Sequence, residues 1–363
     1  MIDSELIKTF RDQVNQNGNF IRQEYGNRNG KNHWNVICSC MDWITVAIEY
    51  IENHEMDNEN INVKCMQAYT YISAIDIVFE SISQLHRVII NDNNISFKNE
   101  NNIFSTKQSQ KDDNDYFKHI RAIFGAHPVN LKNNEDEKWY ASWPTDHVYN
   151  GFDFAVILYS LDAEQDDITF GYQFEELNKF LKSRYNYLET LSLEIDEQYK
   201  KFKDKKINQN IDVSNDHLRQ LKILKDESKK RLNKEYYNYT IEELIILFEA
   251  YNELENKTEI ITNYINDLKK LVDEIYCNLQ NMIFKDLEYD NLLNPEFPKE
   301  IHYELSKIHE CLIDNKFDPM FSYYFEKIKD YLENTIEINA SYDYKKLFLY
   351  ISAGIYHIDK NKK

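Results

Sequence analysis

The residues best suited to chemistry lie in one short segment, residues 116–128, which reads YFKHIRAIFGAHP. Within it Arg121 and His127 are separated by five residues. Histidine titrates near neutral pH and can therefore take up or release a proton during a reaction. A guanidinium offers a planar fork of N–H donors that matches the oxygens of phosphate and carboxylate groups. The pair predicts acid–base chemistry beside a bound anion.

A helix over residues 115–126 would position this pair. Helical spacing places Arg121 and His127 in two adjacent rows that are otherwise apolar, so we expect both to emerge from an apolar stripe. On an ideal helix the two side chains lie about 120° apart, and Gly125 could relax the last turn. Pro128 ends the helix, because a residue before proline disfavours the α region. Two copies of the chain meeting at this stripe would bring two arginines and two histidines together.

This segment resembles the HEPN superfamily, whose ribonuclease members carry an Arg-x4–6-His motif near the end of a helix. Two long amphipathic helices precede the motif, as in a HEPN helical bundle, and the resemblance covers about residues 32–200. It implies a dimeric endoribonuclease that uses no metal or other cofactor. The RNA 2′-OH attacks, His127 acts as general acid or base, and Arg121 stabilises the phosphorane charge. The implied products carry a 2′,3′-cyclic phosphate and a 5′-OH.

Three further basic residues are candidates for a supporting role. His119 follows Asp115 by four positions, which favours a pair on the helix surface and leaves a role in the site as the alternative. Lys118 lies one turn before Arg121 and could hold a second phosphate, or it could simply be solvated. Arg87 ends the preceding apolar helix and could approach the same site, although basic residues are common at helix ends because of the dipole.

A structural interpretation of the pair stays open. Arg121 could form an ion pair with an acid such as Asp115 or Glu80, while His127 caps the helix. Ala122 stands where many HEPN motifs carry a polar residue, which favours a non-enzymatic interaction or sensor protein.

The composition excludes several classes of protein. Only 7 glycines occur among 363 residues, without a GxG or a GxxxxGK[ST] pattern, so a Rossmann dinucleotide site and a P-loop are excluded. The 62 acidic residues exceed the 43 basic ones, giving a net charge of −19, and no half of the chain offers the basic face typical of non-specific nucleic-acid binding. The 5 cysteines do not form a disulfide framework, and no zinc spacing accompanies them. Without a signal-like start or a long apolar run, we expect a cytoplasmic protein with no membrane contact.

The pattern of apolar residues predicts a mainly α protein. Residues 1–30 are polar with weak helical periodicity, and residues 91–114 are Asn-rich and aperiodic, so we expect a long exposed loop there. Aromatic and β-branched runs predict a small antiparallel sheet over residues 139–143, 152–160 and 167–172. The residues from Thr240 onward fit a capping box that opens a long apolar pattern over 240–285, typical of a helical hairpin or coiled coil. Helices are predicted over residues 32–53, 62–90, 115–126, 174–204, 214–233, 299–315, 319–335 and 342–359.

We therefore divide the chain into three segments: an N-terminal HEPN-like bundle with a β insertion near 139–172 (1–172), a region of long charged helices (173–290), and a C-terminal helical bundle (291–363). The favoured function is a HEPN-type endoribonuclease that acts on RNA as a homodimer or higher oligomer. A toxin or anti-phage abortive-infection role follows by analogy with that superfamily. The alternative is a catalytically inactive HEPN-like interaction or sensor protein. The apolar seam of the long helices must be covered by neighbouring helices or by a protein partner bound through residues 174–285.

Overall fold

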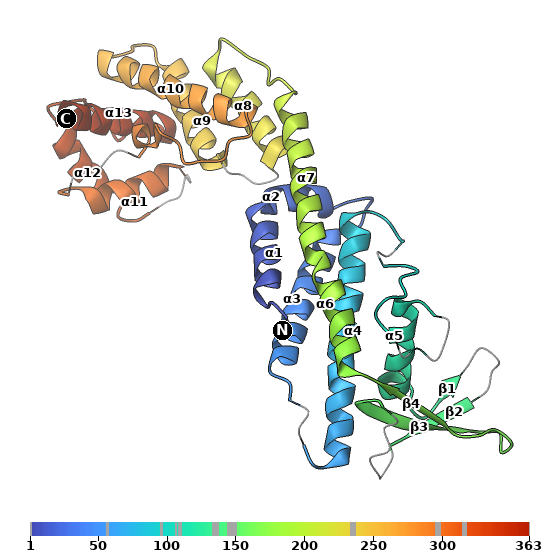
Figure 1. The fold of residues 1–363 in the computed structure, drawn as a ribbon. Coiled ribbons are helices and arrows are strands. Elements are labelled where there is room, and N and C mark those ends of the chain that lie inside the picture. The colour runs from blue at the N-terminus through green and yellow to red at the C-terminus, as the bar shows by residue number, and fades with distance from the viewer. Residues whose placement is uncertain are drawn as a thin grey trace. The chain divides into compact units, whose positions relative to one another are not determined.

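The chain forms two compact units, Met1–Tyr199 and Lys200–Lys363, in the computed structural model (Figure 1). The described part is mainly helical with one small antiparallel sheet, as the sequence predicts. None of the helices in the described ranges is both long and apolar enough to cross a membrane. The structure describes residues 2–55, 58–94, 97–105, 107, 111–132, 138–143, 151–232, 237–294, 299–313 and 318–362.

Two long antiparallel helices, α3 (His33–Glu52) and α4 (Ile61–Ile89), form the centre of the first unit. Their predicted limits are confirmed to within one residue. Each begins at an asparagine whose side chain accepts a backbone N–H of the first turn, Asn32 in α3 and Asn60 in α4. Residues 1–30 add two helices that the weak periodicity did not predict, α1 (Glu5–Gln16) and α2 (Gly18–Tyr25).

The segment that carries the Arg/His pair packs between α4 and the sheet (Figure 1). It consists of α5 (Asp113–Arg121) and a π-turn, η1 (Ala122–Ala126). Phe124 of η1 contacts the sheet through the rings of Phe154 and Tyr172, at centroid distances of 6.2 and 4.8 Å. The four strands lie in sequential antiparallel order: β1 (Leu131–Lys132), β2 (Lys138–Ser142), β3 (Phe154–Ser160) and β4 (Ile168–Tyr172).

Most of the loop between α4 and α5 that the structure describes is exposed, as the sequence predicts, but two points tie it to the bundle. Phe104 is buried between the rings of Tyr116 and Phe180. The fully buried carboxylate of Asp113 accepts the backbone N–H groups of Asn102 and Ile103. A loop rich in asparagine is held because buried carboxylates satisfy its backbone donors.

Two helices complete the first unit, α6 (Phe174–Tyr185) and α7 (Tyr187–Ile207), which runs on into the second unit. Phe180 of α6 packs against Phe117 of α5 at 4.4 Å and against Phe79 of α4 at 5.4 Å. The unit boundary therefore differs from the sequence-based division at residues 172/173, because α6 supplies part of the core of the first unit.

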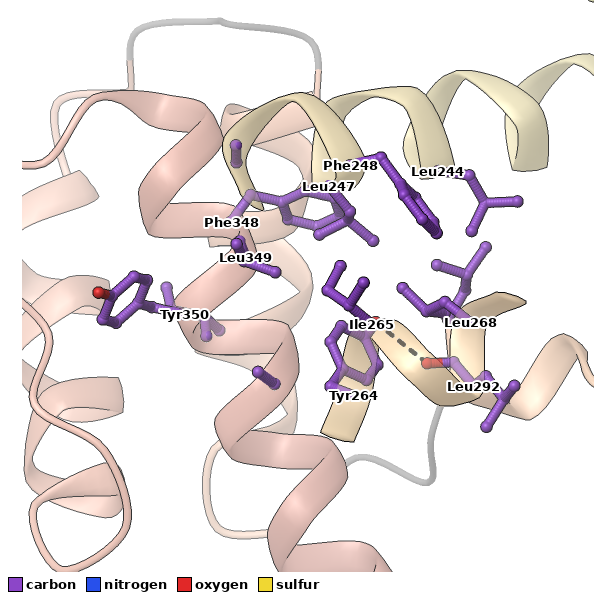
Figure 2. Close-up of a cluster of buried hydrophobic side chains, with 14 of the residues drawn as sticks. Leu244, Leu247, Phe248, Tyr264, Ile265, Leu268, Leu292, Phe348, Leu349 and Tyr350 are labelled. Carbon is purple, nitrogen blue, oxygen red and sulfur yellow. Dashed lines mark hydrogen bonds between the residues drawn. The ribbon is translucent and has the colours of Figure 1, made fainter. Parts of the chain in front are cut away.

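The second unit is an all-helical assembly. Its core joins Leu247 and Phe248, Ile265 and Leu268, and Phe348 from three different helices (Figure 2). The buried hydroxyl of Tyr264 donates to the carbonyl of Leu292 at 3.1 Å. The elements are α8 (His217–Leu232), α9 (Asn238–Glu253), α10 (Glu259–Gln280), the 3-10 turn η2 (Asp290–Leu292), α11 (His302–Ile313), α12 (Phe321–Leu332) and α13 (Tyr344–Lys362).

The apolar pattern over residues 240–285 forms two consecutive helices in contact, α9 and α10, which agrees with the helical-hairpin alternative. The predicted capping box at Thr240 is wrong, because α9 begins earlier, after Tyr237, whereas Thr258 caps α10 through the N–H of Ile261. The apolar seam is covered within the unit by α8 and α13. The seam therefore gives no reason to infer a partner bound through residues 174–285.

Candidate functional site

Arg121, the last residue of α5, is anchored by an aspartate of α4. Its Nε lies 2.8 Å from Oδ2 of Asp76. The arginine side chain is 47% exposed, whereas that of Asp76 is 12% exposed. Nη1 and Nη2 of Arg121 make no hydrogen bond or ion pair with any residue that the structure describes. The guanidinium is thus held at one edge and retains its fork of donors.

Asp76 is the residue of the site that the sequence analysis missed. Burial raises the pKa of this carboxyl above its ordinary value, Arg121 and Lys118 oppose that rise, and Glu80 adds to it. Its Oδ1 is buried and accepts no hydrogen bond from the described residues. The two expected partners of Arg121, Asp115 and Glu80, do not pair with it. The sequence itself could have pointed to Asp76, because it is the one charged residue between positions 64 and 80 and falls on the apolar face of a helix.

His127 follows directly after the π-turn that ends the motif helix. Its backbone N–H bonds to the carbonyl of Ala122 at 3.0 Å, five residues back. Its side chain is exposed and makes no polar contact with the described residues. The ring of Tyr69 from α4 lies over Gly125, where an added Cβ would stand 3.4 Å from the ring carbons. Single π-turns in helices occur frequently at functional sites.

The expectation that Arg121 and His127 emerge from an apolar stripe is wrong. The stripe itself, Tyr116, Phe117, Ile120, Ile123 and Phe124, is buried. Rings of the loop, α6 and the sheet cover it, so it is not available to a second chain. Both residues instead flank it on the exposed side, and their side chains make no hydrogen bond to each other within one chain.

Of the proposed supporting residues, Lys118 lies near Arg121 and Arg87 does not. Lys118 is exposed, its Nζ lies 3.8 Å from Oδ1 of Asp115, and its charge lowers the pKa of Asp76, as that of Arg121 does. Arg87 is on α4, eleven residues beyond Asp76, which is about 16 Å along the helix at about 1.5 Å per residue. Arg87 is therefore too distant to join the guanidinium of Arg121.

His119 does not form the expected surface pair with Asp115. Its ring stands edge-on to Phe170 of the sheet at 5.2 Å. Burial, helped by the charge of Lys111, lowers the pKa of His119 to about 4. The ring is consequently neutral at pH 7 and serves as a packing group between α5 and the sheet.

An exposed apolar surface borders the site. Trp43 and Val46 of α3 are exposed, as are Met66 and Tyr69 of α4. The hydroxyls of Tyr50 and Thr70, 2.6 Å apart, join the two helices there. We call Trp43, Val46, Tyr50, Met66 and Tyr69 the α3–α4 face. Since Tyr69 also covers Gly125, this face reaches the turn that precedes His127.

Over the residues that the structure describes, no three His, Cys, Asp or Glu side chains form a group that could hold a metal ion. Comparison of the chain with protein-family models, with curated proteins and with solved structures found no match.

Proposed function

We propose that this protein is a metal-independent endoribonuclease of the HEPN type. The observation that carries the proposal is the guanidinium of Arg121, held at Nε by the buried Asp76 while its Nη groups have no partner in the described part of the chain. A guanidinium fixed in this way is suited to bind two phosphate oxygens. The exposed His127, which directly follows the π-turn after α5, supplies an imidazole that can take up or release a proton.

The reaction uses the nucleophile that RNA itself carries. The 2′-OH attacks the adjacent phosphorus, a proton leaves the hydroxyl, and a proton is delivered to the 5′-oxygen that departs. His127 acts as general base or general acid in these transfers, and the Nη groups of Arg121 stabilise the charge on the phosphorane. The products carry a 2′,3′-cyclic phosphate and a 5′-OH. Lys118, on the same side of α5, would contact a neighbouring phosphate.

A second copy of the chain completes the proposed site. The α3–α4 face is apolar, exposed and continuous with the turn before His127, so its burial against the same face of another chain would bring two Arg/His pairs together. Two-fold contacts of this kind use one patch on both chains. A role as a toxin or anti-phage effector in the cytoplasm follows from the HEPN resemblance.

Cleavage of total RNA in EDTA by the wild type and by His127→Ala tests the proposal. Positioned proton transfer contributes about 10²–10⁴-fold, so we expect a loss of that order, with cyclic phosphate ends on the wild-type products. Arg121→Lys should restore little of the activity lost in Arg121→Ala, because an ammonium lacks the planar fork. His33→Ala, at the start of α3, is the matched control, and single-stranded DNA should stay intact.

Equal cleavage by wild type and His127→Ala, or loss of cleavage on chelation, would refute the assignment. The second candidate, a non-catalytic interaction or sensor protein, is favoured by the same ion pair, because Asp76 gives the Nε of Arg121 a structural partner without any RNA. It predicts no cleavage by any of these proteins while self-association persists.

A further inference from the structure

A pocket of about 550 Å³ lies on a different part of the first unit from Arg121 and His127. One wall is the end of α3, with Ile51 and Glu52. A second wall is α6, where Phe174, Asn178 and Lys182 recur every four residues and so share one face. Pockets of about 300–1,000 Å³ with an apolar lining and a few polar groups are the usual sites for small ligands.

Aromatic rings form the inner part of the pocket. Tyr71 of α4 stacks on His54 at 5.1 Å and meets the edge of Phe174 at 5.8 Å. The hydroxyl of Tyr71 donates to Oδ1 of Asn178 at 2.6 Å, which orients the amide. The amide N–H groups of Asn178 have no partner among the described residues, so they remain free to donate to a ligand.

The two walls carry opposite charges that do not pair with each other. Neither Glu52 nor Lys182 forms an ion pair or a side-chain hydrogen bond with any residue in the described ranges, although both line the pocket. Glu52 is the last residue of α3, where the negative end of the helix dipole also favours a cation. Burial lowers the pKa of His54, so its ring is neutral at pH 7 and adds no positive charge beside Glu52.

We propose that this pocket binds a zwitterion with an apolar body, the size of an aromatic amino acid or a dipeptide. The ammonium group lies against Glu52. The carboxylate accepts hydrogen bonds from Lys182 and from the amide of Asn178. The apolar body packs on Ile51 and Phe174.

The arrangement of charges distinguishes this ligand from a nucleotide. Among the described residues that line the pocket, a phosphate would find one cation, Lys182, and would meet the carboxylate of Glu52 as a like charge. A zwitterion satisfies both walls at once. The proposal rests on the pocket alone and is independent of the proposed ribonuclease activity.

Calorimetry on the full chain tests it with phenylalanine, tryptophan and the dipeptide Phe-Phe, each beside its N-acetyl and its carboxamide derivative. We expect the zwitterions to bind and each derivative to bind at least about tenfold more weakly, which is about 1.4 kcal/mol. Glu52→Gln should remove the discrimination against N-acetyl compounds, and Lys182→Met should remove the discrimination against carboxamides. Lys179→Met, one turn away and paired with Glu175, is the matched control.

Both substitutions are at exposed positions, and circular dichroism checks that the variants remain folded. The inference is overturned if no zwitterion binds the wild type at millimolar concentration. It is also overturned if binding is unchanged in both variants, or if adenosine monophosphate binds in the pocket more tightly than the zwitterions. None of these measurements requires RNA cleavage, so their result does not depend on whether the protein is a ribonuclease.

Discussion

At the scale of single residues, the ion pair between Asp76 and Arg121 balances two opposing effects. Burial disfavours the charged carboxylate, and its raised pKa shows that Arg121 does not fully compensate. The arginine, in contrast, is half exposed and would lose little stability without its partner. Asp76 is therefore expected to serve the orientation of Arg121 more than the stability of the fold.

Asp76→Asn tests this role. The amide keeps the shape and can still accept one hydrogen bond, but it loses the charge that fixes Arg121. A hydrogen bond to a charged group contributes about 1.5–3 kcal/mol, so we expect RNA cleavage to fall by about tenfold or more. Thermal unfolding should be unchanged or shifted upward, because a buried carboxylate with a raised pKa is removed. A lower melting temperature with unchanged cleavage would contradict the assignment. Glu80→Gln, one turn away and exposed, is the control.

At the scale of elements, a buried carboxylate attaches the loop before α5 to that helix. Asp113, at the start of α5, is fully buried and pairs with Lys107. Burial raises its pKa, but the hydrogen bonds from Lys107, Asn102 and Ile103 outweigh that effect and hold the pKa below its ordinary value. This carboxylate links α5 to the preceding loop.

Asp113→Ala should lower the free energy of unfolding by about 3 kcal/mol, the order found when one partner of a buried pair is removed. Urea unfolding followed by circular dichroism measures the loss. Asp115→Ala, in the same turn but exposed, should change stability by less than about 0.5 kcal/mol. Because the folded-state pKa is depressed, the contribution of Asp113 is present at neutral pH and is lost as the pH falls below about 4. Equal effects of the two substitutions would contradict the role of Asp113.

We expect Glu243 of α9 to make the stability of the protein depend on pH in the opposite sense to Asp113. Burial, with the charge of Asp290, raises its pKa to about 7. The folded state thus binds a proton more tightly than the unfolded state, so stability is greatest at acidic pH and falls as the pH rises through 7. Glu243→Gln should stabilise the second unit by about 1–3 kcal/mol at pH 8 and by little at pH 4.5.

Hydrogen exchange of the α9 amides at the two pH values reads out this unit alone. Tryptophan fluorescence is the internal control, because all 4 tryptophans belong to residues 1–199. A gain in protection of equal size at both pH values would show that Glu243 is not the group that titrates.

At the scale of the whole molecule, the α3–α4 face carries five of the exposed large apolar side chains of the first unit. Trp43 is 54% exposed and Met66 is 60% exposed. Large apolar side chains that stay in contact with water are unfavourable in free energy, and such patches commonly mark interaction sites. The helices of the second unit bury a shared apolar core, although Tyr239 and Tyr303 on its surface are exposed.

The double variant Trp43→Glu, Met66→Glu should therefore convert a dimer into a monomer. Light scattering should give twice the chain mass of 43.7 kDa for the wild type and a single chain mass for the variant. RNA cleavage should fall with the loss of the dimer. Leu193→Glu, an exposed apolar residue of α7, should leave the dimer intact. A wild type that stays monomeric at every concentration would exclude a site shared between two chains.

Much of the fold was predictable because its signals are local. The limits of α3 and α4 follow from asparagine caps and from apolar residues at helical spacing. The strands follow from aromatic and β-branched runs. The three C-terminal helices were predicted in the same way. The first two helices were missed because their apolar residues, among them Phe10, Val14 and Tyr25, are few within a polar stretch.

The candidate site was predictable in its residue types and not in its environment. Spacing alone identified Arg121 and His127 at the end of one helix. Only the tertiary structure decided that the apolar stripe between them is covered, that Asp76 anchors the arginine, and that a pocket joins residues 51–54 and 71 to residues 174–182. Periodicity determines which side chains share a face of a helix, because neighbours three and four residues apart are fixed by local geometry. What covers that face is decided by contacts between segments distant in sequence, and no local spacing encodes those contacts.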